Sequence, residues 1–262
     1  PDAEPARACS TFTGAPARRT DWQPGDWFRA DPPLPGMAVE RDGDAPCVAG
    51  IPWGRSTRLI LRAGLPGEDG MTLRADTPIT IAMPNRQARI AFDTRSFILP
   101  RGQEARVSVA TVNVNALNIR VMRVTERNLV NLRRSWTPGE SMEIYQADNI
   151  PEELGRLVWE GRVEIPRFEA NRTNRTAIPL PDSLRGFGPG LFVLIARQGD
   201  GGAGSDDRAM AALPIIATDL GVVAWRGADG LAVQVRGLGD ARPRANTRVM
   251  LMARNNDVLA EA

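Results

Sequence analysis

Residues 104–124 read Glu-Ala-Arg-Val-Ser-Val-Ala-Thr-Val-Asn-Val-Asn-Ala-Leu-Asn-Ile-Arg-Val-Met-Arg-Val. In the first half, Val107 and Val109 alternate with small or polar residues, and in the second half Leu117 and Ile119 do the same. Period-two alternation is typical of β-strands that bury one face. The phase shifts between the two halves, which predicts a short turn or corner there. We therefore expect a central strand pair of an antiparallel sandwich, with the middle domain laid out around it.

Segments of the same kind recur along the rest of the chain. They are short and are separated by turn residues, and the 25 Gly and 21 Pro supply many such turns. About seven of them fall in the middle of the chain, which is the signature of a β-sandwich. The sequence therefore predicts an all-β protein. The expected strands are Ser56–Arg62, Thr77–Met83, Arg89–Phe92, Phe97–Leu99, Leu157–Ile165, Arg175–Leu180, Leu191–Arg197, Arg208–Ala217, Val222–Trp225, Leu231–Val235 and Thr247–Arg254.

The spacing of these strands predicts three domains. Residues 1–86 form an N-terminal β-rich domain that begins with an extended, weakly patterned segment. Residues 87–217 form a β-sandwich with a mostly polar insertion near 126–156. Residues 218–262 begin a further domain, because three to four strands are too few to close a sandwich.

Charge and hydropathy exclude several classes of protein. The 33 basic residues, all Arg, are matched by 31 acidic ones and spread evenly, for a net charge of +2. A nucleic-acid site would need a clustered basic face, so we expect no nucleic-acid partner. The longest nearly apolar stretch, Ala209–Ala217, is far shorter than the ~20 residues that span a bilayer. The chain starts at Pro1 without Met, which suggests a piece of a longer, processed precursor.

Cys9 and Cys47 are the only cysteines and flank a loop-rich segment. Two isolated cysteines in this arrangement suggest a disulfide formed in an oxidising compartment. Such a link would stabilise the fold by roughly 3–4 kcal/mol in the chain-entropy model. The alternative is two free buried thiols.

The residue types needed for common catalytic and metal sites are missing. The sequence has no His, so the usual general base for a Ser or Cys nucleophile is absent. Two cysteines without His cannot build a zinc site. The acidic pairs Glu152-Glu153 and Asp206-Asp207 are more simply solvated surface residues than calcium ligands. We expect no catalytic, cofactor-binding or metal-binding residue, no cofactor and no enzymatic activity.

Several short motifs follow one another along the chain. They are Cys47-Val-Ala-Gly-Ile-Pro-Trp-Gly54, Leu61-Arg-Ala-Gly-Leu-Pro-Gly-Glu-Asp-Gly70, Phe97-Ile-Leu-Pro-Arg101, Val112-Asn-Val-Asn115, Arg123-Val-Thr-Glu-Arg-Asn-Leu129, Gly188-Pro-Gly-Leu-Phe-Val-Leu-Ile-Ala196, Asp219-Leu-Gly221, Asp229-Gly230 and Ala253-Arg-Asn-Asn256. Taken together and in this order, these motifs resemble the N-terminal region of bacterial α2-macroglobulins and the strands that close one macroglobulin domain and open the next.

This resemblance implies a fold and a function. The fold is a tandem array of macroglobulin-like, fibronectin III-like antiparallel β-sandwiches. The function is that of a broad-spectrum endopeptidase inhibitor, a periplasmic protease trap usually held at the inner membrane by a lipid anchor outside this segment. The partners would be proteases, reached through the full-length protein, and neighbouring domains of the same chain. The family's Cys-x-Glu-Gln thioester motif is not in these residues.

Two other hypotheses remain open on the residues alone. A surface adhesin or carbohydrate-binding sandwich array would show the same strand pattern, and so would the accessory domain of an enzyme. The first of these would be a binding module, which is a different class of protein from an inhibitor scaffold.

Overall fold

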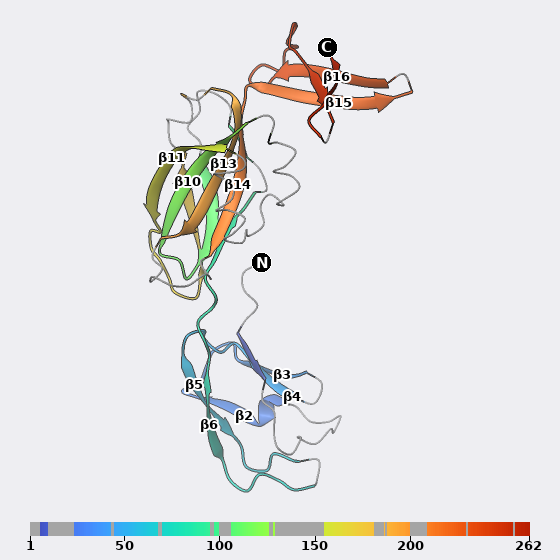
Figure 1. The fold of residues 1–262 in the computed structure, drawn as a ribbon. Coiled ribbons are helices and arrows are strands. Elements are labelled where there is room, and N and C mark those ends of the chain that lie inside the picture. The colour runs from blue at the N-terminus through green and yellow to red at the C-terminus, as the bar shows by residue number, and fades with distance from the viewer. Residues whose placement is uncertain are drawn as a thin grey trace. The chain divides into compact units, whose positions relative to one another are not determined.

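The structure, a computed structural model, describes residues 6–9, 24–42, 45–67, 70–94, 97–99, 106–125, 128, 155–180, 186, 188–199, 209–228, 230–253 and 255–262. In this part of the chain nearly all regular structure is β-strand, with a short 3-10 helix at Pro24–Asp26 (Figure 1). The chain forms two compact units. The first comprises residues 1–87 and 170–173, and the second comprises residues 88–169 and 174–262.

The first unit contains two three-stranded antiparallel sheets, with the orders β1-β4-β3 and β2-β5-β6. Phe28 and Ala30 from one sheet and Val48 from the other belong to one buried cluster, together with Leu59 and Leu61. The two sheets therefore share a single core. The strands are β1 (Arg7–Cys9), β2 (Phe28–Asp31), β3 (Ala38–Asp42), β4 (Ala45–Ala49), β5 (Ser56–Leu61) and β6 (Thr77–Ala82).

The second unit contains a sandwich of a five-stranded and a three-stranded sheet. The five-stranded sheet has the order β11-β10-β13-β14-β8, and the strands β11, β10, β13 and β14 can be followed side by side in Figure 1. The three-stranded sheet has the order β12-β9-β7. All pairs are antiparallel except β14 with β8, which is parallel. The strands are β7 (Arg89–Phe92), β8 (Phe97–Leu99), β9 (Arg106–Val112), β10 (Ala116–Val124), β11 (Gly155–Glu164), β12 (Thr173–Pro179), β13 (Gly190–Gln198) and β14 (Met210–Ala217).

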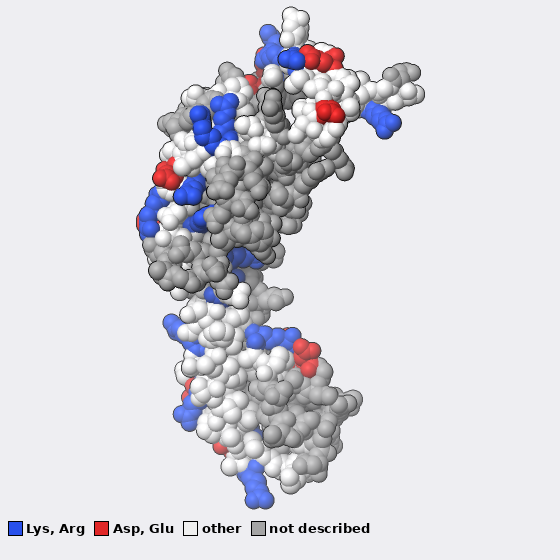
Figure 2. Space-filling view, in the orientation of Figure 1, with Lys and Arg blue, Asp and Glu red and all other residues white. Residues whose placement is uncertain are grey.

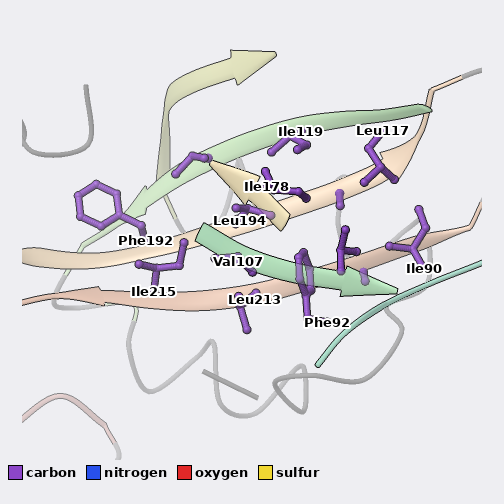
Figure 3. Close-up of a cluster of buried hydrophobic side chains, with 14 of the residues drawn as sticks. Ile90, Phe92, Val107, Leu117, Ile119, Ile178, Phe192, Leu194, Leu213 and Ile215 are labelled. Atoms are coloured by element: carbon purple, nitrogen blue, oxygen red, sulfur yellow. The ribbon is translucent and has the colours of Figure 1, made fainter. Parts of the chain in front are cut away.

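The core of this sandwich lies between the two sheets. Figure 3 shows Phe92 and Val107 from the three-stranded sheet facing Ile119, Leu194 and Leu213 from the five-stranded sheet. Each of these residues belongs to a strand whose alternate positions point to the same face. The alternation seen in the sequence therefore places the apolar residues where the core needs them.

The predicted pairing of the two halves of residues 104–124 is wrong. Strand β9 lies in the three-stranded sheet, and β10 lies in the five-stranded sheet. Residues 113–115 make the corner between the sheets, where Asn113 has a positive φ of 51° and the Asn115 carbonyl accepts a hydrogen bond from the Ile165 amide. Alternation shows which face of a strand is buried, but it does not identify the neighbouring strand.

The five-stranded sheet also buries apolar side chains on its other face. Val193 and Ile195 alternate with the core residues of β13 and form a second cluster with Met122, Met210 and Ala212. Strand β13 is therefore buried on both faces. This agrees with its continuous apolar run, which is typical of fully buried strands.

Two further hairpins follow the sandwich. Strand β15 (Leu220–Gly227) pairs with β16 (Gly230–Gly237), and β17 (Met250–Met252) pairs with β18 (Val258–Glu261). The expected strand Thr247–Arg254 is shorter in the structure, and its partner β18 was not predicted. The predicted division at residues 86 and 217 stays a prediction, and most of the insertion near 126–156 lies outside the described residues.

Candidate functional site

The structure joins Cys9 and Cys47 in a disulfide between β1 and β4. The two residues are directly opposite one another in the antiparallel register, and the covalent link connects positions 38 residues apart in the sequence. Val48, next to Cys47, packs into the core of the first unit, so Cys47 points to the other face of the sheet. Cys9 is exposed, whereas Cys47 is fully buried.

Several charged residues lie close to this disulfide. Arg7 Nη2 lies 3.3 Å from Asp42 Oδ2, and a carboxylate oxygen of Asp42 lies within 4.8 Å of both sulfur atoms. Glu40 is the cross-strand neighbour of Cys47 on β3. In the oxidised state neither sulfur is a thiolate, so these residues do not form a metal-ligand set.

A second polar cluster in the first unit is centred on Asn171. Its amide nitrogen donates to Asn85 Oδ1 at 3.0 Å, and its side-chain oxygen accepts a hydrogen bond of 2.8 Å from the backbone amide of Arg86. Gly54, with a φ of +70°, lies against both asparagine amides, and a Cβ at this position would collide with them. The sequence predicts only a domain boundary at residue 86 and gives no signal for this anchor, because the partners of Asn171 lie 85 residues or more away.

Two sequons, Asn171-Arg-Thr173 and Asn174-Arg-Thr176, are formal glycosylation signals. The side-chain amide of Asn171 is hydrogen-bonded to Asn85 and to the backbone of Arg86. The Asn174 amide donates to the Glu169 carbonyl at 3.0 Å and accepts from the Glu169 amide at 2.9 Å. Both side chains are therefore used within the fold and are poorly placed to carry a sugar.

The hairpin β15–β16 exposes the face that carries most of its apolar residues. Leu220 and Val222 on β15 lie on the same face as Leu231 and Val233 on β16, because Val222 is opposite Val235 and every second residue shares a face. On this face Val222 is 63% exposed and Leu231 is 50% exposed, whereas Val235 is only 9% exposed. In a sandwich, such a face packs against a second sheet.

Two carboxylates near the C-terminus hold Arg side chains. The hydrogen bond from the Arg242 amide, followed by those from the Arg244 guanidinium at 2.9 and 3.0 Å, lowers the pKa of Asp240. Arg248 binds both oxygens of Glu261, at 2.6 and 2.8 Å, and lowers the pKa of Glu261. These pairs close a turn and a hairpin.

Nothing in the described residues adds a reactive group to these clusters. Ser108 donates a hydrogen bond to Asp93, and Arg175 lies 3.7 Å from the same carboxylate, but all three side chains are on the surface. Without His in the sequence, no Ser-His or Cys-His nucleophile can be assembled from this chain. Figure 2 shows the described Arg side chains at several separate places on the visible face.

The described residues contain no helix of the length and hydropathy needed to cross a membrane.

Comparison with known proteins connects these features to a family. The model of the bacterial alpha-2 macroglobulin MG2 domain matches residues 91–206, which include most of the sandwich of the second unit. The model of the bacterial alpha-2-macroglobulin MG3 domain matches residues 217–262, which contain the two hairpins. Together they cover more than half of the chain. No curated protein matches the sequence.

Solved structures show the same fold at low sequence identity. A structure of native α2-macroglobulin from Escherichia coli, spanning domains MG0-NIE-MG1, is 18% identical, with a TM-score of 0.55 over 98% of this chain and 84% of that chain. Salmonella α2-macroglobulin reacted with methylamine is 17% identical, with a TM-score of 0.69 over 100% of this chain. The present chain covers only 16% of that Salmonella chain. The chain belongs to the bacterial α2-macroglobulin family, and it folds into tandem macroglobulin-like β-sandwich domains.

Proposed function

We propose that this chain is a scaffold portion of a bacterial α2-macroglobulin that inhibits endopeptidases of broad specificity by trapping them. In this role the chain has no catalytic residue and binds no cofactor. Its partners are proteases, met through the full-length protein, and the neighbouring domains of the same protein. The observation that carries the proposal is the match of MG2 and MG3 domain models in consecutive order along one chain.

The second part of the proposal is the location. We propose that the protein works in the periplasm and is held at the inner membrane by a lipid anchor outside these residues. The Cys9–Cys47 disulfide supports an oxidising compartment, since structural disulfides are rare in the cytosol. Cell fractionation tests this part, because the protein should be found with the inner-membrane fraction and be released by cutting on the periplasmic side. Recovery from the cytosol would contradict it.

The inhibitory function has its own test. A trap limits access to the protease but leaves its active site free. The full-length protein should therefore slow the digestion of a large protein substrate by trypsin, while the cleavage of a small chromogenic peptide continues. The chain of residues 1–262 alone should leave both reactions unchanged, because two sandwich units cannot enclose a protease.

Two outcomes would contradict the proposal. Equal inhibition of large and small substrates by the full-length protein would indicate a direct active-site inhibitor. No inhibition at all, combined with binding to a glycan or a cell surface, would favour the adhesin alternative.

A further inference from the structure

The disulfide lies on the outer side of an edge strand rather than in the core of the first unit. Strand β1 is the edge of the β1-β4-β3 sheet. Cys47 faces away from the core cluster to which Val48 belongs. Cys9, its partner, is exposed. Because Cys47 is 0% exposed, a small thiol would have to reach the bond from the side of Cys9.

Strand β1 has few other strong links among the described residues. The segment gives the core only the side chains of Ala6 and Ala8, which are single methyl groups. The ion pair between Arg7 and Asp42 joins side chains that are 42% and 64% exposed, and such pairs contribute little to stability. The strand itself is three residues long. Its non-covalent attachments are the short antiparallel pairing with β4 and the hydrogen bond of 3.1 Å that the Gly50 amide donates to the Ala6 carbonyl. The disulfide adds the covalent link to these few hydrogen bonds.

The rest of the first unit has a core that does not depend on β1. Leu59 and Leu61 of β5 are 0% and 5% exposed, and β5 is paired on both sides, with β2 and β6. Phe28 packs in the same cluster. Local opening is easiest where few apolar contacts hold an edge. The first unit therefore consists of a weakly held edge strand, β1, and a well-packed core formed by its other strands.

We propose that the Cys9–Cys47 disulfide is a reducible clasp that decides whether β1 stays on its sheet. A thiolate of a dithiol reductant attacks Cys9 Sγ, and Cys47 leaves as a thiolate that takes up a proton. The second thiol of the reductant then attacks the mixed disulfide and releases Cys9. Two protein thiols and one oxidised, cyclic disulfide result. Strand β1 then leaves the sheet and exposes the edge of β4.

The test uses the full chain under native conditions, with dithiothreitol as the dithiol and hydrogen exchange followed by mass spectrometry. Reduction without denaturant should succeed, because Cys9 is exposed. Amides of β1 should lose their protection and exchange at the rate of an unfolded peptide, while amides of β5 remain protected. A double variant, Cys9→Ser with Cys47→Ser, should show the same pattern without reductant.

A matched control separates the disulfide from the nearby ion pair. Arg7→Gln removes the contact with Asp42 but leaves the disulfide intact, so β1 should stay protected in this variant. If the amides of β1 stay protected after reduction, or if reduction requires denaturant, the disulfide does not control the attachment of β1 as proposed. The proposal is also contradicted if β1 and β5 lose protection together, because the disulfide would then hold the whole unit.

Discussion

The sandwich formed by β7–β14 and the hairpins formed by β15–β18 both have strands in which apolar and other residues alternate. The two regions bury these apolar side chains to different extents. In the sandwich, Leu194 is 1% exposed because two sheets face one another across a common core. In the hairpin β15–β16, Leu231 also follows the alternation but is 50% exposed. The alternation of residues thus determines which face of a strand is apolar. Packing against a second sheet determines whether that face is buried from solvent.

The difference in burial between the sandwich and the hairpins affects how much each contributes to stability. Burial of a large aliphatic side chain contributes about 1.5–3 kcal/mol, and close packing around it adds more. A two-stranded hairpin is only marginally stable in water by itself. The sandwich should therefore set the stability of the second unit, and the hairpins should add little.

The largest expected effect comes from a matched pair of substitutions. Leu194→Ala leaves a cavity between the two sheets and should lower the free energy of unfolding by about 3–4 kcal/mol. Leu231→Ala makes the same chemical change on the open hairpin and should cost less than about 0.5 kcal/mol. Chemical denaturation of both variants measures the difference. Similar costs at the two positions would mean that the hairpin face is packed in solution.

A smaller effect should appear at low pH in the hairpin β17–β18. Because the pKa of Glu261 is lowered in the folded state by Arg248, the stabilisation is fully present above the ordinary value of 4.5 and is lost as the pH falls through the folded-state pKa. An NMR titration of the Glu261 carboxyl should show this depressed pKa. In Arg248→Gln the pKa should move back up, and an unchanged value would show that the pair does not form in solution.

The sequence predicted much of the fold from local signals. Alternation located β5, β7, β9 and β13 to within a residue or two, because each buries at least one face along its whole length. It did not predict the separation of β9 from β10, because the corner at residues 113–115 depends on the packing of two sheets. The strands β1, β3 and β4 were missed as a sheet, since they are short and carry Arg, Glu, Asp and Pro among their residues.

The candidate sites are formed by residues that are far apart in the sequence, so they are harder to predict from local sequence signals. The isolation of Cys9 and Cys47 in the sequence was enough to suggest their pairing, and the structure adds that the bond lies on the outer face of an edge strand. The anchor at Asn171 left no signal that one sequence could reveal. Its partners Asn85 and Arg86 lie in the connection between β6 and β7, which the sequence predicts only as a domain boundary.

Hydrogen exchange of the chain tests most directly the central structural claim, that the sandwich core is closed while the hairpin face is open. The amides of Val193 and Leu194 in β13 should be among the slowest to exchange. The amides of Val222 to Ala224 in β15 should exchange at least about 100-fold faster, because their hydrogen bonds lie in an exposed two-stranded sheet. Equal protection of β13 and β15 would contradict the account, since it would show that the hairpin is buried as firmly as the sandwich.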